Sequence, residues 1–103
     1  MNGLTSEYLD FVPGKMTRPP REDINNVIFV FSRRKDKTIY KKKNYFIGTI
    51  VYQNKIKEYI FVYNKEYDAL RSDTLMKIGA FLDNLNKNRL VFDPEAGEIY
   101  PNK

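Results

Sequence analysis

The stretch of this sequence with the clearest capacity for chemistry is cationic. It reads "RRKDKTIYKKK" and carries seven cations against the single acid Asp36, which gives it a net charge of +6. The whole 103-residue chain sums to only +5, so everything outside this window totals −1. The cations are Arg33, Arg34, Lys35, Lys37, Lys41, Lys42 and Lys43. Cations at this density can contact successive phosphates and release their counterions, which makes the affinity depend on salt.

The same basic window has a second interpretation, as a solvated β-loop whose lysines keep a sheet edge soluble. We favour binding for two reasons. The charge excess exceeds the net charge of the chain, and the segment that follows is rich in aromatic residues.

That aromatic segment predicts a β-hairpin, "YFIGTIVY" and "KEYIFVYN" around a two-residue turn at Asn54-Lys55. Paired residues would then have numbers that sum to 109. One face would be aromatic, with Phe46, Tyr52, Tyr59, Phe61 and Tyr63, and the other aliphatic, with Ile47, Thr49, Val51, Ile60 and Val62. Exposed rings stack on unpaired bases at roughly 1 to 3 kcal/mol each. The alternative is that the rings are buried in the core. We expect this for Phe46 and Phe61, and we expect the tyrosines to remain exposed to solvent.

These patterns predict a non-enzymatic protein that binds single-stranded DNA or RNA. We expect stacking by Tyr40, Tyr45, Tyr52, Tyr59 and Tyr63, and backbone contacts from the seven cations and Lys57. Single strands are favoured over duplex because no predicted helix carries a basic face that could read a major groove. Arg18 and Arg21, in "TRPPRED", could extend the backbone contacts, but a plain connector is the favoured interpretation there.

Catalytic and metal chemistry find little support in the sequence. The chain has no cysteine and no histidine, which removes thiolate chemistry and the commonest general base and metal ligand. It has no glycine-rich phosphate loop, and its acids, Glu58 beside Lys57 or Asp68 with Asp73, show no recognisable spacing. We therefore expect no enzyme, no metal and no cofactor.

The fold class expected is α+β, in a single domain over 1–103. We expect an antiparallel, mainly three-stranded β-meander packed by its aliphatic face on one long C-terminal amphipathic helix, with a short N-terminal helix and a small C-terminal β-hairpin. "NVIFVFSRR", Asn26–Arg34, is apolar on both faces, which predicts an interior strand. The expected parts are an N-terminal helix over Leu4–Val12, ended by "PGK" and followed by a proline-containing connector (1–25), then the sheet (26–64), a helical region (65–88) and a hairpin or tail around "DPEAG" (89–103). With Asn64 and Ser72 as candidate caps, the helical region is one helix or two with a break near Arg71, and the helix that crosses the sheet covers Asp73–Asn86.

The order of these elements resembles the layout of small single-strand-binding proteins of the positive-cofactor-four and Whirly type. The resemblance covers residues 26 to 87 and concerns element order alone, so no functional residue is carried across. It implies curved sheets that grip unpaired DNA, and a homodimer is compatible with it.

A second function class stays open: a small inhibitor or adaptor, of viral or mobile-element origin, that docks on an acidic surface of a host protein. Small size and a composition rich in lysine and asparagine are compatible with it.

The N-terminus has no basic leader before an apolar core, and no apolar run approaches the roughly 20 residues of a spanning helix. We expect an intracellular, cytoplasmic protein without a membrane partner.

Overall fold

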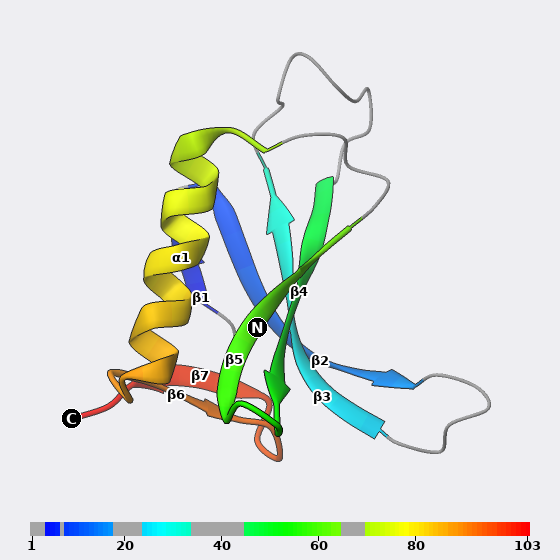
Figure 1. The fold of residues 1–103 in the computed structure, drawn as a ribbon, viewed down its shortest axis with the longest axis vertical. Helices are drawn as coiled ribbons and strands as arrows, with labels where there is room; N and C mark the ends of the chain where they lie inside the picture. Colours follow the sequence, from blue (N-terminus) through cyan, green and yellow to red (C-terminus); the bar gives the residue numbers. More distant parts are fainter. Residues whose placement is uncertain (1–3, 7, 18–23, 34–44, 65–69) are drawn as a thin grey trace.

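The computed structural model describes residues 4–6, 8–17, 24–33, 45–64 and 70–103. They form an α+β fold, as expected: one antiparallel sheet, one helix and a two-stranded C-terminal hairpin (Figure 1). The sheet has five strands in chain order, where we expected mainly three. Its strands are β1 (Leu4–Ser6), β2 (Leu9–Thr17), β3 (Ile24–Ser32), β4 (Tyr45–Gln53) and β5 (Glu58–Tyr63). The helix is α1 (Ser72–Asn86), and the hairpin consists of β6 (Leu90–Asp93) and β7 (Glu98–Pro101).

The prediction of an N-terminal helix was wrong, because its residues form β1 and β2. Leu9 and Phe11, two residues apart, are both fully buried, so burial repeats with the two-residue period of a strand and not with the period of a helix. Pro13 does not break β2. The N–H of Arg33 donates to the carbonyl of Tyr8, so even-numbered residues of β2 bond to β3 and Pro13 turns its nitrogen outward. At that edge β1 pairs no further than Phe11, and a missing N–H there costs the β2–β3 pairing nothing.

A β-bulge in β4 decides which side chains face the core. Val30 pairs with Gly48, but the next residue of β3, Phe31, pairs with Phe46, so Ile47 is an extra residue. Ile47 is fully buried in the core, while Phe46 lies with Phe31 on the opposite face. The neighbouring carbonyls remain bonded, because Asn64 donates its backbone N–H to Ile47 and its side-chain amide to Phe46, at 2.9 and 2.7 Å.

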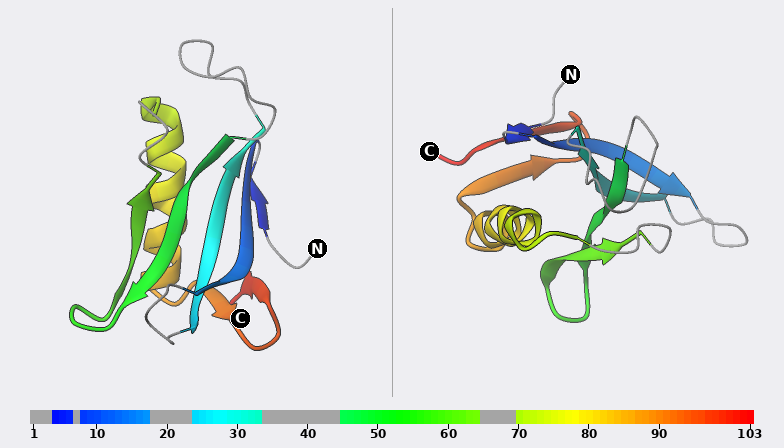
Figure 2. Two further views of the ribbon diagram at one scale, coloured as in Figure 1. Left: turned by 90° about the vertical axis from the view of Figure 1, so that its right-hand side faces the viewer. Right: turned by 90° about the horizontal axis from the view of Figure 1, so that it is seen from above.

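Helix α1 packs on the face of the sheet opposite to the one we expected. We call this the helix face; it carries Leu9, Phe11, Ile28, Val30, Ile50, Tyr59 and Phe61. The rings of Phe11 and Phe81 stack there with centroids 3.8 Å apart. Seen from above, the sheet bends around α1 (Figure 2). The aliphatic residues that we assigned to the helix lie on the other side, the outer face, except for Ile47.

Helix α1 begins one residue before the predicted Asp73 and ends at the predicted Asn86, but with 15 residues it is neither clearly long nor clearly amphipathic. It buries Thr74, Ile78, Phe81 and Leu85, yet Leu75 and Met76 are 50% and 74% exposed. Arg71 occupies the N-cap position of α1, and its side chain makes no capping hydrogen bond to the backbone. Neither Ser72 nor Asn64 is therefore the N-cap of α1. The predicted start of the helical region, 65–69, lies outside the described residues.

The C-terminal hairpin is confirmed, and it closes the end of the core. Ile99 is 5% exposed within the core cluster, and Leu90 and Phe92 pack against that cluster. The carboxylate of Asp93 accepts the backbone N–H groups of Glu95 and Ala96, at 3.1 and 3.2 Å. These bonds form the turn that "DPEAG" predicts.

The register of the β4–β5 hairpin differs from the prediction by two residues. Tyr52 pairs with Tyr59 and Ile50 with Phe61, so paired numbers sum to 111. The turn therefore has four residues, 54–57, with Lys57 in the left-handed region at φ 55°. A shift by two keeps each residue of β5 on its predicted face. The predicted contact of Phe61 with Gly48 is also formed, diagonally: the ring ends 2.5 Å from where a Cβ of Gly48 would stand.

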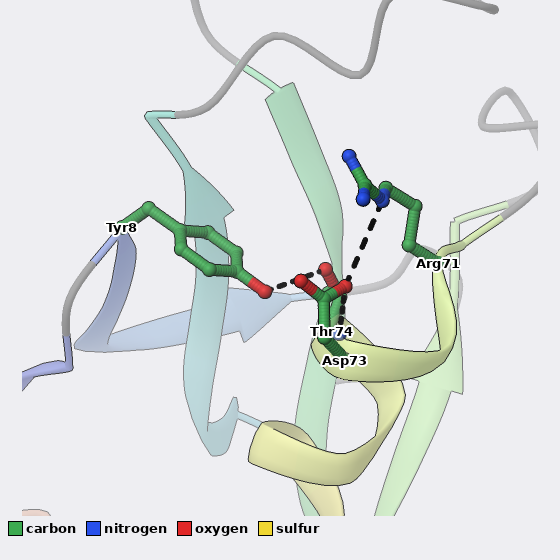
Figure 3. A network of polar contacts seen from close by, with 4 residues as sticks. All are labelled: Tyr8, Arg71, Asp73 and Thr74. Carbon is green, nitrogen blue, oxygen red and sulfur yellow. Dashed lines mark hydrogen bonds and ion pairs between the residues drawn. The ribbon is translucent and has the colours of Figure 1, made fainter.

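A small polar network fastens the start of α1 to the turn before β2. The Tyr8 hydroxyl shares a hydrogen bond of 2.9 Å with the hydroxyl of Thr74, which is 4% exposed (Figure 3). The N–H of Thr74 donates to the Asp73 carboxylate at 2.8 Å, and the Arg71 guanidinium lies 3.8 Å from the same oxygen. The network connects residues that are 66 positions apart.

The first prediction concerns the close approach at Gly48. A Cβ at this position would meet the Val62 carbonyl and the Phe61 ring, so Gly48→Ala should lower the free energy of unfolding by about 1 to 3 kcal/mol. Gly79→Ala is the matched control: nothing lies within 4 Å of its Cβ position, and alanine should stabilise the helix by about 0.5 to 1 kcal/mol. Urea unfolding measures both changes; equal effects would contradict the packing described.

The second prediction concerns the Tyr8 hydroxyl. Tyr8→Phe removes one partner of a buried Thr74 hydroxyl and should cost about 1 kcal/mol in urea unfolding. Tyr100→Phe removes a hydroxyl from a ring that is 41% exposed and should change stability by less than about 0.5 kcal/mol. A Tyr8 variant as stable as the Tyr100 variant would show that the network does not hold α1.

Candidate nucleic-acid interface

The strand residues on either side of the basic window lie next to each other. Ser32 at the end of β3 pairs with Tyr45 at the start of β4, so the window connects neighbouring strands. The end of β3 and the start of β4 stand at the top of the molecule in the view of Figure 1. Seven of the predicted site residues lie outside the described residues: Arg34, Lys35, Lys37, Tyr40, Lys41, Lys42 and Lys43.

Arg33 is the one predicted cation of the window that the structure describes. Its Nε lies 3.3 Å from a carboxylate oxygen of Asp10, and its side chain is 51% exposed. An exposed pair of this kind contributes at most about 1 kcal/mol. Part of the Arg33 charge is therefore compensated locally, while half of its surface still faces solvent.

The predicted single aromatic face is divided between the two sides of the sheet. The bulge puts Phe46 on the outer face, where its ring centroid lies 5.9 Å from that of Phe29 and 5.5 Å from that of Phe31. Phe61 instead packs on the helix face over Gly48. Phe46 and Phe61 are thus packing residues, as we expected, but in two different layers. The five rings do not form one continuous surface on which bases could stack.

Three of the predicted tyrosines have described side chains, and they differ in exposure. Tyr52 and Tyr63 are 47% and 38% exposed, and Tyr59 is half-buried. The rings of Tyr52 and Tyr59 meet edge to face, with centroids 5.1 Å apart. The strand beneath them is fixed by Asn86 of α1, whose side-chain amide bonds both backbone groups of Tyr59: it accepts the N–H at 2.7 Å and donates to the carbonyl at 3.1 Å.

Sequence reasoning missed Asn86, and no local signal could have found it. The two residues are 27 positions apart, and asparagine in the last turn of a helix reads as an ordinary C-terminal residue. Ile56 was also missed, because the predicted turn did not contain it. It is 56% exposed in the four-residue turn beside Lys55 and Lys57.

Burial raises the pKa of the Tyr59 phenol above its ordinary value of 10.0, and the nearby Tyr52 phenol raises it further. Both causes disfavour the phenolate: the half-buried ring loses solvation, and a second negative charge would lie close to the first. Tyr59 therefore stays a neutral hydrogen-bonding group throughout the neutral range.

The tyrosines lie at different distances from the basic window. Tyr63 pairs with Gly48, three residues along β4 from Tyr45, which is about 10 Å at the rise of a β-strand. Tyr52 is seven residues along, about 23 Å away by the same measure. The structure thus brings Tyr63 toward the window and puts the Tyr52–Tyr59 pair, with Lys57, at the other end of the sheet.

Comparison with known proteins adds no identification: no protein-family model, curated protein or solved structure matches this chain. Among the described residues, no three acidic side chains gather in a group that could hold a metal ion. No helix in this part of the chain is long and apolar enough to cross a membrane.

The third prediction concerns the Tyr59 phenol. Its pKa is higher in the folded state than in the unfolded chain, so its contribution to stability is complete below about pH 10 and is lost as the pH rises through the folded pKa. The tyrosinate absorbance of the wild type minus that of Tyr59→Phe should titrate with a midpoint above 10.0. A midpoint at or below that value would mean that the ring is solvated.

Proposed function

We propose that this protein binds single-stranded nucleic acid and does not transform it chemically. The window 33–43 supplies the contacts to phosphate, and Tyr63, at the same end of the sheet, lies within reach of a neighbouring base. The observation that carries the proposal is the net charge of +6 in eleven residues that lie between the paired strand residues Ser32 and Tyr45.

The distribution of acids in the fold supports this assignment. The acidic counterpart in the sequence, Asp93, Glu95 and Glu98, lies around the β6–β7 turn. That turn stands at the bottom of the molecule in Figure 1, at the opposite end from the end of β3 and the start of β4. At physiological salt, charges separated by more than about 8 Å are largely screened from each other. The acids of the hairpin therefore leave the field of the window intact.

The preference for single strands over duplex rests on the helix. A helix that reads a major groove contacts base edges there most often through Arg or Lys side chains. Helix α1 carries Lys77 against Asp73 and Asp83, so it has a small negative net charge. Its C-terminal cation, Lys87, is paired with Asp83 at 3.0 Å. No basic reading face exists on the one helix among the described residues, whereas a mobile single strand can adapt to a cationic window and an adjacent ring.

The fourth prediction is a salt-dependent affinity that charge reversal in the window abolishes. If five cations contact phosphates, the logarithm of the affinity for single-stranded DNA should fall with the logarithm of salt at a slope of about −3.5. Lys41→Glu, Lys42→Glu and Lys43→Glu together should remove the binding. Fluorescence anisotropy with labelled single-stranded DNA, duplex DNA and RNA at several salt concentrations measures both effects.

The matched control changes the same amount of charge elsewhere. Lys15, Arg89 and Lys103 are all exposed and lie outside the window, and their joint replacement by glutamate shifts the net charge equally. This variant should keep most of the affinity. A flat salt response, or equal losses in the two triple variants, would contradict a site in the window. Unchanged oligonucleotide binding by the Lys41–Lys43 variant would contradict it as well.

A further inference from the structure

The β4–β5 turn presents a second group of residues suited to contact a nucleic acid. We call it the turn patch, defined by Tyr52, Lys55, Ile56, Lys57 and Tyr59. Tyr52 and Ile56 are 47% and 56% exposed, so each presents apolar surface to solvent. A single exposed apolar residue is ordinary, but here two of them and the half-buried Tyr59 ring belong to one end of the same hairpin.

The two tyrosines of the turn patch are held in place by contacts with α1 and with each other, which favours binding. Asn86 fixes the backbone of Tyr59 with two hydrogen bonds, and the Tyr59 ring supports the Tyr52 ring edge to face at 5.1 Å. The exposed ring therefore stands on a second ring that is anchored to α1. Less side-chain entropy is lost when a ligand stacks on a ring already held in place.

The charges around the turn patch fit a polyanion. Lys55 and Lys57 are exposed, and neither forms an ion pair with a described residue. The nearest acid in the sequence, Glu58, pairs with Gln53, so its side chain points to the outer face, opposite to Tyr52 and Tyr59. The turn that joins the strands of Tyr52 and Tyr59 thus carries two uncompensated ammonium groups, and these two strands carry no acid on the face of the two rings.

We infer that the turn patch is a second contact for the same nucleic-acid strand, with a base stacked on Tyr52 and phosphates near Lys55 and Lys57. The inference rests on the proposed function. It adds a length to the ligand, because Tyr52 lies about 23 Å from Tyr45 along β4. At about 3.4 Å per nucleotide, a stacked strand of roughly seven nucleotides reaches both contacts.

The test compares two ligand lengths in four proteins. Labelled oligothymidylates of about 4 and about 15 nucleotides are titrated into the wild type, Tyr52→Ala, Tyr52→Phe and Tyr100→Ala. Tyr100 is a matched control because its ring is 41% exposed but lies on the acidic C-terminal hairpin. Loss of one stacked base, worth about 1 to 3 kcal/mol, corresponds to roughly a 5- to 150-fold weaker affinity.

We expect Tyr52→Ala to weaken binding of the long oligonucleotide by this factor and to leave binding of the short one unchanged. Tyr52→Phe and Tyr100→Ala should match the wild type with both. If Tyr52→Ala binds the long oligonucleotide as tightly as the wild type, the turn patch is not a contact, although the window can still bind. A wild type that binds neither length would refute the proposed function itself, and the second contact with it.

Discussion

The extra residue in β4 is the constraint on which the arrangement of the sheet depends. Both faces of β3 are apolar, so the side chains of its neighbours must be sorted between two packed layers. Without a bulge, Phe46 would share the helix face with Gly48 and Ile50. With it, Ile47 enters the core under α1, and Phe46 completes a cluster with Phe29 and Phe31 on the outer face. The side chain and backbone of Asn64 satisfy the carbonyls that the bulge leaves out of register.

What the sequence could predict was local. The apolar run of β3, the helix near Ile78 and Leu85, and the "DPEAG" turn each depend on a few neighbouring residues, and each was found. The N-terminal strands were missed, because the spacing of Leu4, Tyr8, Phe11 and Val12 fits a helical period. Pro13 reads as a break until its position at a free edge is known. The bulge, like the side of the sheet that α1 covers, is decided by contacts between distant residues, and no short pattern encodes these.

The candidate site, too, was predictable only in the part that depends on local sequence. The charge of the window is a property of composition and needs no fold, so it survives every correction to the topology. The aromatic face depended on the bulge and on the side covered by α1, and it did not survive as one surface. What remains is Tyr63 near the window and Tyr52 about 23 Å away, farther than the Debye length of about 8 Å at physiological salt. In the binding that we propose, two such contacts would be independent sites coupled only by the ligand chain, through the effective concentration that the first contact sets for the second.

The Asn86 contact also constrains how a partner can approach β5. An edge strand offers unpaired backbone groups to any extended chain, and proteins protect such edges. At Tyr59 both outward backbone groups are already occupied by the Asn86 amide, which takes the place that a sixth strand would hold. A partner arriving at this end of the hairpin therefore cannot bind by adding a strand at Tyr59. It meets side chains instead, the exposed Tyr52 ring and Ile56 between two lysines. Such a surface suits a single-stranded nucleic acid better than an extended peptide. The bases of a nucleic acid offer π-faces and its backbone offers phosphates, and neither contact needs a hydrogen bond to the protein backbone.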